Sequence, residues 1–247
     1  GGFASNTEMR AKHDLRLKYT GTTNFPGATG DGIVMAQAIG AGCVDMGYIQ
    51  TYPLCTPTTG KLDRVAERGI VLVNRNGERF VDESGRRDVR SRAILTQKGG
   101  SAFSIFDEQN AGEVKLHTRV ISGKTIAELA KKTGINEERL RKTIEKFNSY
   151  IDVGKDAEFR ARVHGLKKIR RPPFYAVEVA PSVHYTMGGL TINAKAQVLN
   201  VDHRVIPGLY AAGEVVGGIH GTNRLGGNAL TDVVVFGRIA GSNAASC

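Results

Sequence analysis

Two segments late in the chain combine cationic side chains with closely spaced glycines. Residues 184–189 read His-Tyr-Thr-Met-Gly-Gly, and residues 217–229 read Gly-Gly-Ile-His-Gly-Thr-Asn-Arg-Leu-Gly-Gly-Asn-Ala. Glycine has no Cβ atom, so the backbone at these positions can approach a flat ligand closely. His184 and Arg224 are natural carboxylate-binding groups, since a guanidinium can hold a carboxylate through two hydrogen bonds. The two segments therefore predict a site for a flat anionic ligand.

The second segment leads into a predicted helix from Ala229 to Ala245. The first amide groups of a helix lack partners within the helix and carry partial positive charge. We expect the start of this helix to stabilise an anionic ring or a carboxylate. The alternative is an ordinary helix cap in which Arg224 holds a structural acid.

The composition is that of an ordinary globular protein. The 247 residues are 40% hydrophobic and 23% charged, which allows one good core or two modest ones. No apolar run approaches the roughly 18 residues that span a bilayer, so no membrane span is predicted. Cys43, Cys55 and Cys247 are odd in number and widely spaced. This spacing predicts free thiols, no metal site and no covalently attached c-type haem in this chain.

The net charge of +10 is spread along the chain. The densest basic run, Lys-Lys-Ile-Arg-Arg-Pro-Pro at residues 167–173, ends in two prolines and favours a solvated linker. A positive field can also steer small anionic substrates toward a site. Because the basic residues are not clustered, we expect no nucleic acid partner.

Local patterns predict several of the elements that would position the candidate site. Residues 74–77, Asn-Arg-Asn-Gly, lie between two apolar runs, which is typical of a β-hairpin with a tight turn. Residues 122–150 are predicted to be helical, with a capping box that begins at Thr125 and a break at Gly134. The hairpin would form a rigid platform for the residues that follow it.

Residues 29–42 predict a loop that opens into a short helix, because apolar residues recur there at helical spacing. Asp31 lies at the start of this helix. It is therefore either a helix cap or a carboxylate that binds a ligand hydroxyl. Residues 154–171 are predicted to be a loop, and residues 174–179 a strand.

Six segments in the same order resemble FAD-dependent fumarate reductases (flavocytochrome c) and urocanate reductases. The segments are residues 1–3, 30–32, 70–83, 184–189, 208–215 and 220–229. The resemblance covers essentially the whole chain. It rests on the joint order of the segments rather than on any one of them.

The resemblance implies an α/β fold in which an α+β clamp is inserted into a Rossmann-like FAD-binding lobe. Residues 1–48 and 184–247 would be segments of the FAD-binding lobe, and residues 49–183 the substrate-capping clamp. The Gly-x-Gly-x-x-Gly fingerprint of such a lobe is missing from this sequence. In the family this fingerprint lies before the position of Gly1. The chain is therefore predicted to be the C-terminal part of a longer protein that supplies the nucleotide-binding half.

By resemblance, the cofactor is FAD. Asp31 and Glu214 match carboxylates that bind sugar hydroxyls, and Asn228, Ala229 and Leu230 match positions at the isoalloxazine ring. The electrons would come from an FMN or haem domain, or from a separate protein, outside this chain.

The substrate implied by the resemblance is a small unsaturated carboxylate. His184, Arg224 and Gly227 would bind its carboxylate, and Arg87 would donate a proton to carbon. Arginine is normally too weak an acid for this role, so a relay must return the proton at once. Judged from the residues alone, the stretch 82–88 is better interpreted as an exposed charged turn.

Two positions depart from the fumarate reductase pattern. The glutamate of the proton relay falls on Asp63, and the relay arginine falls on Ala66. Arg64 or Arg68 would have to replace that arginine after a small shift. The histidine that binds the second carboxylate of fumarate is replaced by Tyr52.

A phenol is neutral at pH 7 and has an aromatic face, so Tyr52 suits a flat ring better than a second carboxylate. Tyr52 together with Asp63 resembles urocanate reductase, whose substrate bears an imidazole. Asp63 would then accept a hydrogen bond from the imidazole N–H. The alternative is that Tyr52 is a structural aromatic beside Pro53.

The sequence thus predicts an FAD-dependent oxidoreductase that reduces the carbon–carbon double bond of an α,β-unsaturated carboxylate. Urocanate, reduced to dihydrourocanate, is the first expected substrate. Fumarate, reduced to succinate, and other aryl acrylates are the alternatives. A hypothesis of another class is a non-catalytic substrate-binding or assembly fragment that needs a separate FAD-binding half. A flavin dehydrogenase working in the oxidising direction does not explain His184, Arg224 and Arg87 together.

Overall fold

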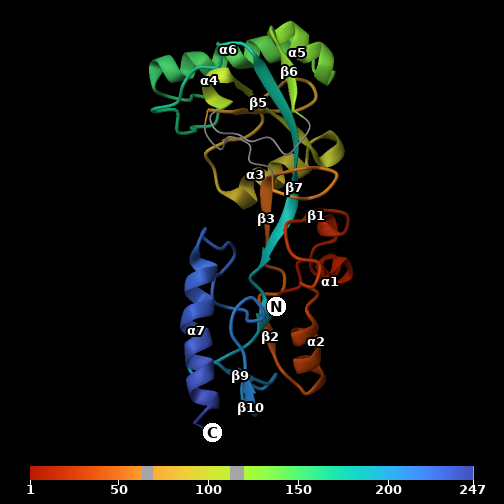
Figure 1. Cartoon of the computed structure of the whole chain (residues 1–247), viewed down its shortest axis with the longest axis vertical. Coiled ribbons are helices and arrows are strands. Elements are labelled where there is room, and N and C mark those ends of the chain that lie inside the picture. Colours follow the sequence, from red (N-terminus) through yellow and green to blue (C-terminus); the bar gives the residue numbers. More distant parts are fainter. Residues whose placement is uncertain (63–68, 112–119, 247) are drawn as a thin grey trace. The chain divides into compact units, whose positions relative to one another are not determined.

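The structure is a computed structural model that describes residues 1–62, 69–111 and 120–246. It confirms the predicted α/β class, since helices and sheets alternate along the chain (Figure 1). The chain divides into two compact units. Unit 1 consists of Gly1–Thr51 and Val183–Cys247, and unit 2 of Tyr52–Ser182. These boundaries lie close to the predicted ones, while the roles of FAD-binding lobe and clamp stay predictions.

Unit 1 is built from short strands and two longer helices. Its elements are α1 (Thr7–His13), η1 (Leu15–Leu17), β1 (Gly21–Thr22), α2 (Asp31–Ala38), β2 (Cys43–Val44), β8 (Gly189–Leu190), β9 (Gln197–Leu199), β10 (Val205–Tyr210) and α7 (Asn228–Ala244). β2 pairs antiparallel with β8, and β9 pairs antiparallel with β10. Phe3, Ile33, Leu190 and Val198 belong to its core cluster.

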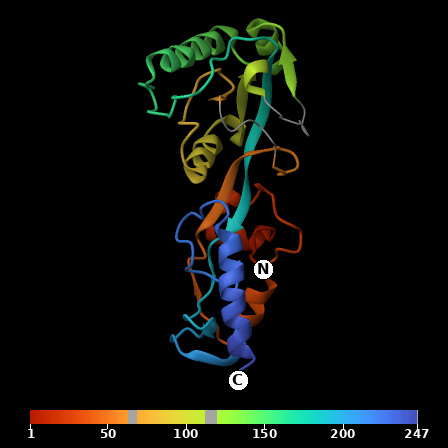
Figure 2. The same ribbon diagram turned by 60° about the vertical axis from the view of Figure 1, so that its left-hand side comes forward.

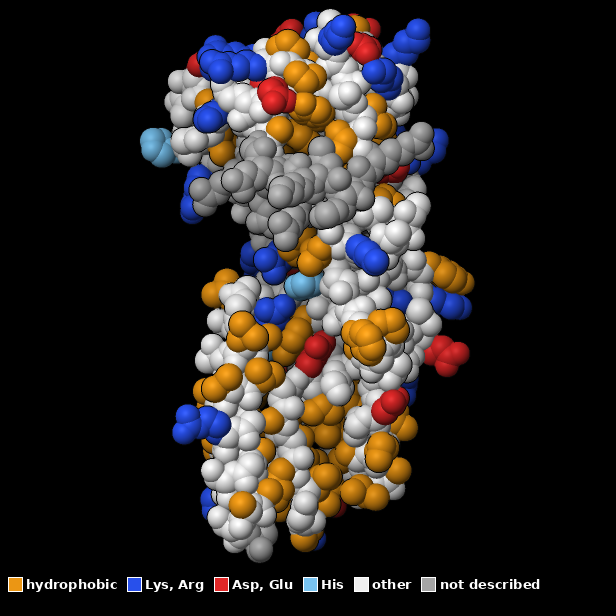
Figure 3. All heavy atoms as spheres, viewed as in Figure 1, with side chains coloured by type: hydrophobic (Ala, Val, Ile, Leu, Met, Phe, Trp, Pro, Cys, Tyr) orange, Lys and Arg blue, Asp and Glu red, His pale blue; other side chains and the backbone are white. Residues whose placement is uncertain are grey.

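The two longer helices of unit 1 bury few of their apolar side chains. In α7, Asp232 is the buried residue, whereas Leu230 and Val234 are 72% and 58% exposed. In α2, Met35 is 72% exposed. Figure 3 shows hydrophobic side chains on the surface of both helices. Burial of an apolar stripe, which normally fixes a surface helix, therefore does not account for α7.

Unit 2 is a sheet with helices packed against it (Figure 2). The strands are β3 (Ile49–Cys55), β4 (Val71–Val73), β5 (Ala102–Asp107), β6 (Ile121–Gly123) and β7 (Phe174–Thr186). The helices are α3 (Arg87–Leu95), η2 (Lys98–Gly100), α4 (Glu108–Ala111), α5 (Ile126–Thr133) and α6 (Glu137–Val153). The sheet order is β1-β7-β5-β4, and both β3 and β6 also pair with β7. β3 and β7 each continue from one unit into the other.

Strand alternation gives unit 2 a core on each face of its sheet. Val71 and Val73 pack in one cluster with residues of α5 and α6, whereas Leu72 packs in the other. Successive side chains of a strand point to opposite faces, which explains this division. The second cluster includes Tyr52 and Ile94, the latter from α3.

The predicted turn at residues 74–77 is confirmed, but the arm that follows it forms no strand and meets β4 in an isolated bridge between Arg79 and Val73. The amide of Gly77 donates to the carbonyl of Asn74 at 2.9 Å, and Gly77 has φ of 80°, a conformation that favours glycine. The predicted helical stretch at 122–150 is wrong at its beginning, because residues 122 and 123 belong to β6. It is confirmed from α5 onward: the helix begins after Thr125, whose hydroxyl accepts from the amide of Glu128 at 3.1 Å, and it breaks at Gly134. The predicted strand at 174–179 continues to Thr186 as β7.

Candidate functional site

The Arg224 guanidinium is held in place within unit 1. Its Nη2 donates to Oε1 of Gln50 at 3.2 Å, and its Cζ lies 4.4 Å from the centre of the Tyr185 ring. The side-chain nitrogen Nε2 of Gln50 in turn donates to Oδ1 of Asn223 at 2.7 Å and to the Arg224 carbonyl at 2.6 Å. Arg224 is 7% exposed. A buried guanidinium fixed by a hydrogen bond and an aromatic face is suited to bidentate recognition of an anion.

His184, the other predicted carboxylate-binding residue, lies on β7 next to Tyr185. Its Nδ1 atom is 2.7 Å from the hydroxyl of Thr23. This contact fixes the orientation of the imidazole ring. Whether Nδ1 donates or accepts in it depends on the tautomer of His184.

A second cluster in unit 1 surrounds Tyr185. Its hydroxyl lies 3.4 Å from Nε2 of His220, and that nitrogen lies 3.2 Å from Oδ2 of Asp232. Burial raises the pKa of Tyr185, and the negative charges of Glu214 and Asp232 raise it further. Our sequence analysis assigned no role to Tyr185 or Asp232.

Glu214, a predicted FAD ligand, packs against β7 and the beginning of the chain. Its Oε1 accepts from the amide of Thr186 at 2.8 Å and from the Thr186 hydroxyl at 3.1 Å. Burial raises the pKa of Glu214, although these hydrogen bonds oppose the shift. A Cβ atom at Gly2 would lie 2.2 Å from the Thr186 hydroxyl and 2.6 Å from Cγ of Glu214, so only glycine fits there.

Asp31 is the first residue of α2, exposed at its N-terminal end. Its Oδ1 accepts from the hydroxyl of Thr29 at 2.8 Å. The cap position is occupied by Gly30, with φ of 81° and no side-chain cap bond. The alternative interpretation of Asp31 as the helix cap is therefore wrong, because Gly30 already takes the left-handed conformation at that position. Its role as a carboxylate that binds a ligand hydroxyl stays a prediction.

The N-terminus of α7 is not capped by a side chain. Gly227 is the cap residue, with φ of 88°, and the helix begins at Asn228, one residue before the predicted start. Asn228 and Leu230 are exposed, and Ala229 is half-buried. The first turn contains no acidic residue that would compensate its positive end. These features fit a ligand with an electron-rich edge at this turn.

The predicted proton donor, Arg87, is the first residue of α3 in unit 2. Its Cζ lies 4.8 Å from the centre of the Tyr52 ring. The neighbouring acid Asp88 pairs with Arg86 instead, with Oδ2 and Nη2 2.6 Å apart. This hydrogen bond is the main cause of the lowered pKa of Asp88. Arg87 thus belongs to a helix rather than to a charged turn.

Tyr52 has two sets of neighbours. It is 8% exposed and packs in the core cluster that contains Leu54, Ile70 and Val177. The Arg87 guanidinium also lies over the Tyr52 ring at cation–π distance. The structure therefore confirms Tyr52 as a core aromatic, whereas its role toward substrate stays a prediction.

A buried ion network lies close to Arg87 in sequence. Arg79 donates to Glu83 from Nε at 2.9 Å and from Nη2 at 2.6 Å, and its Nη2 lies 2.7 Å from Oδ2 of Asp156. Glu83 also accepts from the amide of Leu72 at 3.1 Å. Sequence analysis missed this network, because no local signal links residues 79 and 156.

Asp63, the predicted relay acid, lies outside the described residues, as do Ala66, Arg64 and Arg68. Of the predicted site residues that the structure describes, Tyr52 and Arg87 meet in unit 2. In unit 1, Glu214 lies near enough to Arg224 for that positive charge to oppose the rise in the pKa of Glu214 that burial causes.

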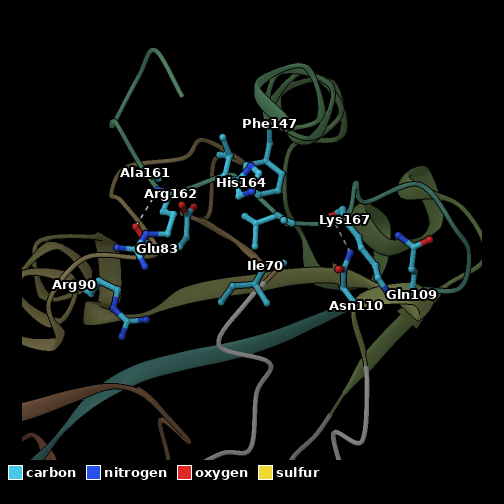
Figure 4. Close-up of a pocket in the computed structure, with 15 residues that line it drawn as sticks. Ile70, Glu83, Arg90, Gln109, Asn110, Phe147, Ala161, Arg162, His164 and Lys167 are labelled. Carbon is cyan, nitrogen blue, oxygen red and sulfur yellow. Dashed lines mark hydrogen bonds between the residues drawn. The ribbon is translucent and has the colours of Figure 1, made fainter. Parts of the chain in front are cut away.

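Unit 2 also contains a cavity of about 580 Å³, shown in Figure 4. Its lining includes the basic residues Arg90, Arg162 and Lys167 and the acidic residue Glu83, which Arg79 already compensates. None of the described candidate site residues lines this cavity.

No helix among the described residues is long and apolar enough to cross a membrane. Within the same part of the chain, no three histidine, cysteine or acidic side chains form a group that could hold a metal ion.

Comparison with known proteins supplies a family context. The model of the FAD binding domain family matches residues 1–230. Fumarate reductase (cytochrome) of Shewanella frigidimarina is 44% identical over 253 residues, covering 99% of this chain and 44% of that protein. Urocanate reductase of Eggerthella lenta is 45% identical over 264 residues, covering 100% of this chain and 43% of that protein.

The structure is also similar to the open conformation of a flavocytochrome c3 fumarate reductase, with a TM-score of 0.83 and 43% sequence identity. That likeness covers 100% of this chain and 45% of the other. The chain therefore spans less than half the length of each of these three proteins.

Proposed function

Because the chain belongs to the FAD binding domain family, we propose that it forms the substrate site of a flavin-dependent reductase acting on an α,β-unsaturated carboxylate. FAD is the cofactor of this family. The observation that carries the proposal is the Arg224 guanidinium, buried and fixed by Gln50 and Tyr185 a few residues before the uncapped start of α7. A fixed guanidinium recognises a carboxylate without having to reorganise.

Arg224 and His184 bind the substrate carboxylate in this proposal, with Gly227 allowing close backbone approach. The Thr23 hydroxyl, 2.7 Å from Nδ1, orients the His184 ring. Neutralising the carboxylate makes the conjugated double bond a better electron acceptor. Positioning and charge are what the protein contributes to such a reaction.

Bound FAD would supply the hydride for the reduction. Asp31 and Glu214 would hold its sugar hydroxyls, and Asn228, Ala229 and Leu230 would meet its ring system. The N-terminus of α7 has no side-chain cap, which supports the assignment of residues 228–230 to the ring system. Its free backbone amides and partial positive charge favour an electron-rich partner.

Arg87 donates the proton to carbon in the proposed reaction. Its support by the Tyr52 ring favours this role, since the contact restrains the guanidinium in one orientation. An arginine holds its proton tightly, so proton return through Asp63 forms part of the proposal.

The first proposed substrate is urocanate, and fumarate is the alternative. Tyr52 favours urocanate, because a neutral aromatic side chain suits a ring-bearing enoate better than a second carboxylate. The similarity to both a urocanate reductase and a fumarate reductase supports the broader class. We also propose that an FMN or haem domain, or a separate protein, delivers the electrons.

The test is anaerobic oxidation of a reduced viologen dye by the intact flavoprotein, supplied in turn with urocanate and fumarate. We expect urocanate to have the higher kcat/KM, and Tyr52→His to move the preference toward fumarate. Tyr19, which is 90% exposed, offers the control variant Tyr19→His. An unchanged preference in Tyr52→His would refute the role of Tyr52. No flavin in the purified protein and no turnover of any enoate would instead favour the non-catalytic fragment.

A further inference from the structure

Asp232 is a buried charge on a helix that otherwise buries little. Its side chain is 3% exposed, and it is the buried residue among those described in α7. Placing a carboxylate in such an environment is costly unless hydrogen bonds compensate the charge. An apolar residue at this position would serve packing alone, so the acid calls for a specific explanation.

The hydrogen atoms around Asp232 can be assigned from the chemistry of its neighbours. A carboxylate only accepts, so Nε2 of His220, 3.2 Å from Oδ2, must carry a hydrogen and donate it. The Tyr185 hydroxyl, 3.4 Å from the same nitrogen, then cannot donate to it. Oδ1 of Asp232 is buried, and no described donor lies within normal hydrogen-bond distance of it. The Tyr185 hydroxyl oxygen can instead accept from the same N–H, so His220 connects Asp232 to Tyr185.

The Tyr185 ring connects this cluster to Arg224. Tyr185 and His220 meet edge to face, with ring centres 5.5 Å apart and planes at 76°. The Arg224 guanidinium lies over the face of the Tyr185 ring, with Cζ 4.4 Å from the ring centre. Gln50 holds the guanidinium through Nη2, so the ring and the amide together fix its plane.

We propose that Asp232 is a positioning residue that, through His220 and Tyr185, holds the Arg224 guanidinium in the orientation that binds the substrate carboxylate. This inference rests on the proposed function, because it takes Arg224 to be the carboxylate ligand. It adds three residues that do not touch the substrate. It also makes the beginning of α7 part of the carboxylate site through a side chain, in addition to its backbone amides.

The proposal predicts a defect confined to substrates with a carboxylate. Asp232→Asn removes the charged acceptor of the His220 N–H, so His220 and, through it, Tyr185 are held less firmly. We expect KM for the enoate acid to rise roughly tenfold, the effect of one hydrogen bond to a charged group, with a smaller change in kcat. KM for the methyl ester of the same enoate should change less than about twofold, since Arg224 gains little from an ester.

Variants of Tyr185 test the same chain of contacts. Tyr185→Phe keeps the ring under Arg224 and removes the hydroxyl, so KM for the acid should rise about threefold. Tyr185→Leu removes the aromatic face, and the rise should reach roughly ten- to thirtyfold. Asp202→Asn changes an exposed acid of unit 1 and is the matched control. FAD content and the unfolding temperature, measured for every variant, separate a local defect from loss of the fold.

Arg224→Gln distinguishes the inference from the function on which it rests. If Arg224→Gln leaves the ratio of acid KM to ester KM unchanged, the proposed carboxylate site is wrong. If it raises that ratio while Asp232→Asn and Tyr185→Leu do not, the site stands and the positioning role is overturned. Equal effects on acid and ester in the folded variants would also overturn it, because a merely structural residue would affect both substrates.

Discussion

Replacing Asp156 with asparagine breaks one side of the buried ion network around Arg79. The Asp156 side chain is fully buried, with Oδ2 2.7 Å from Nη2 of Arg79. It also accepts from the amides of Glu158, Phe159 and Ala161 at 2.8, 3.1 and 3.2 Å. Asparagine keeps the shape and one acceptor oxygen. Its NH2 group, however, can only donate, and would face an amide or a guanidinium that also donates.

The expected loss of stability follows from the contacts that remain. Removing one partner of a buried ion pair costs about 3 to 5 kcal/mol, since the other charge is left uncompensated. Arg79 keeps its three hydrogen bonds to Glu83. We therefore expect the lower end, about 3 kcal/mol of the free energy of unfolding. The exposed pair of Glu137 and Arg141 in α6 is predicted to contribute at most about 0.5 kcal/mol, so Glu137→Gln is the matched control.

Urea unfolding followed by circular dichroism measures both variants against the parent protein. For an m-value of about 2 kcal/mol/M, the midpoint of Asp156→Asn should fall by roughly 1.5 M, and that of Glu137→Gln by about 0.25 M or less. A loss below about 1 kcal/mol for Asp156→Asn, the range of an exposed ion pair, would refute the reasoning. Equal losses in the two variants would refute it as well.

Three further predictions concern activity, packing and pH. Arg87→Ala should abolish turnover while FAD stays bound, and appreciable activity, compared with the control Arg86→Ala, would exclude Arg87 as the proton donor. Gly2→Ala should destabilise the protein by about 1 to 3 kcal/mol because its Cβ would clash with β7 and Glu214, whereas Gly1→Ala has open space and should not. Burial opposes a low pKa at Asp156, but its hydrogen bonds from a guanidinium and backbone amides lower it on balance. The unfolded chain then binds the proton more tightly, so stability should fall as the pH drops below about 4, and the loss should be smaller in Asp156→Asn.

Local chemistry made much of the fold predictable. The turn at Asn74 to Gly77, the cap at Thr125 and the break at Gly134 all depend on residues close together in the sequence. The same holds for the glycine-rich segment before α7, where the start of the helix was predicted to within one residue. Interactions within one turn leave a signature that does not need the tertiary structure.

Contacts between distant segments could not be predicted in this way. Arg79 and Asp156 are separated by the whole of α5 and α6, and neither residue type implies the other. The cluster of Tyr185, His220 and Asp232 joins β7 to the first turns of α7. Tyr185 and His220 belonged to recognised segments, but Asp232 did not. In the sequence of α7, the buried acid Asp232 cannot be distinguished from an acid that faces solvent.

The double environment of Tyr52 limits how substrate range can diverge in this family of sequences. Its ring fills space in the core cluster and also supports Arg87. If Tyr52 contacts substrate as proposed, a smaller side chain that alters this contact also removes core volume at the same step, and natural proteins have little stability to spare. Substitutions of Tyr52 that change the substrate preference should follow compensating substitutions at core neighbours such as Leu54 and Ile70. Evolution of specificity here is then expected to depend on the order in which mutations occur.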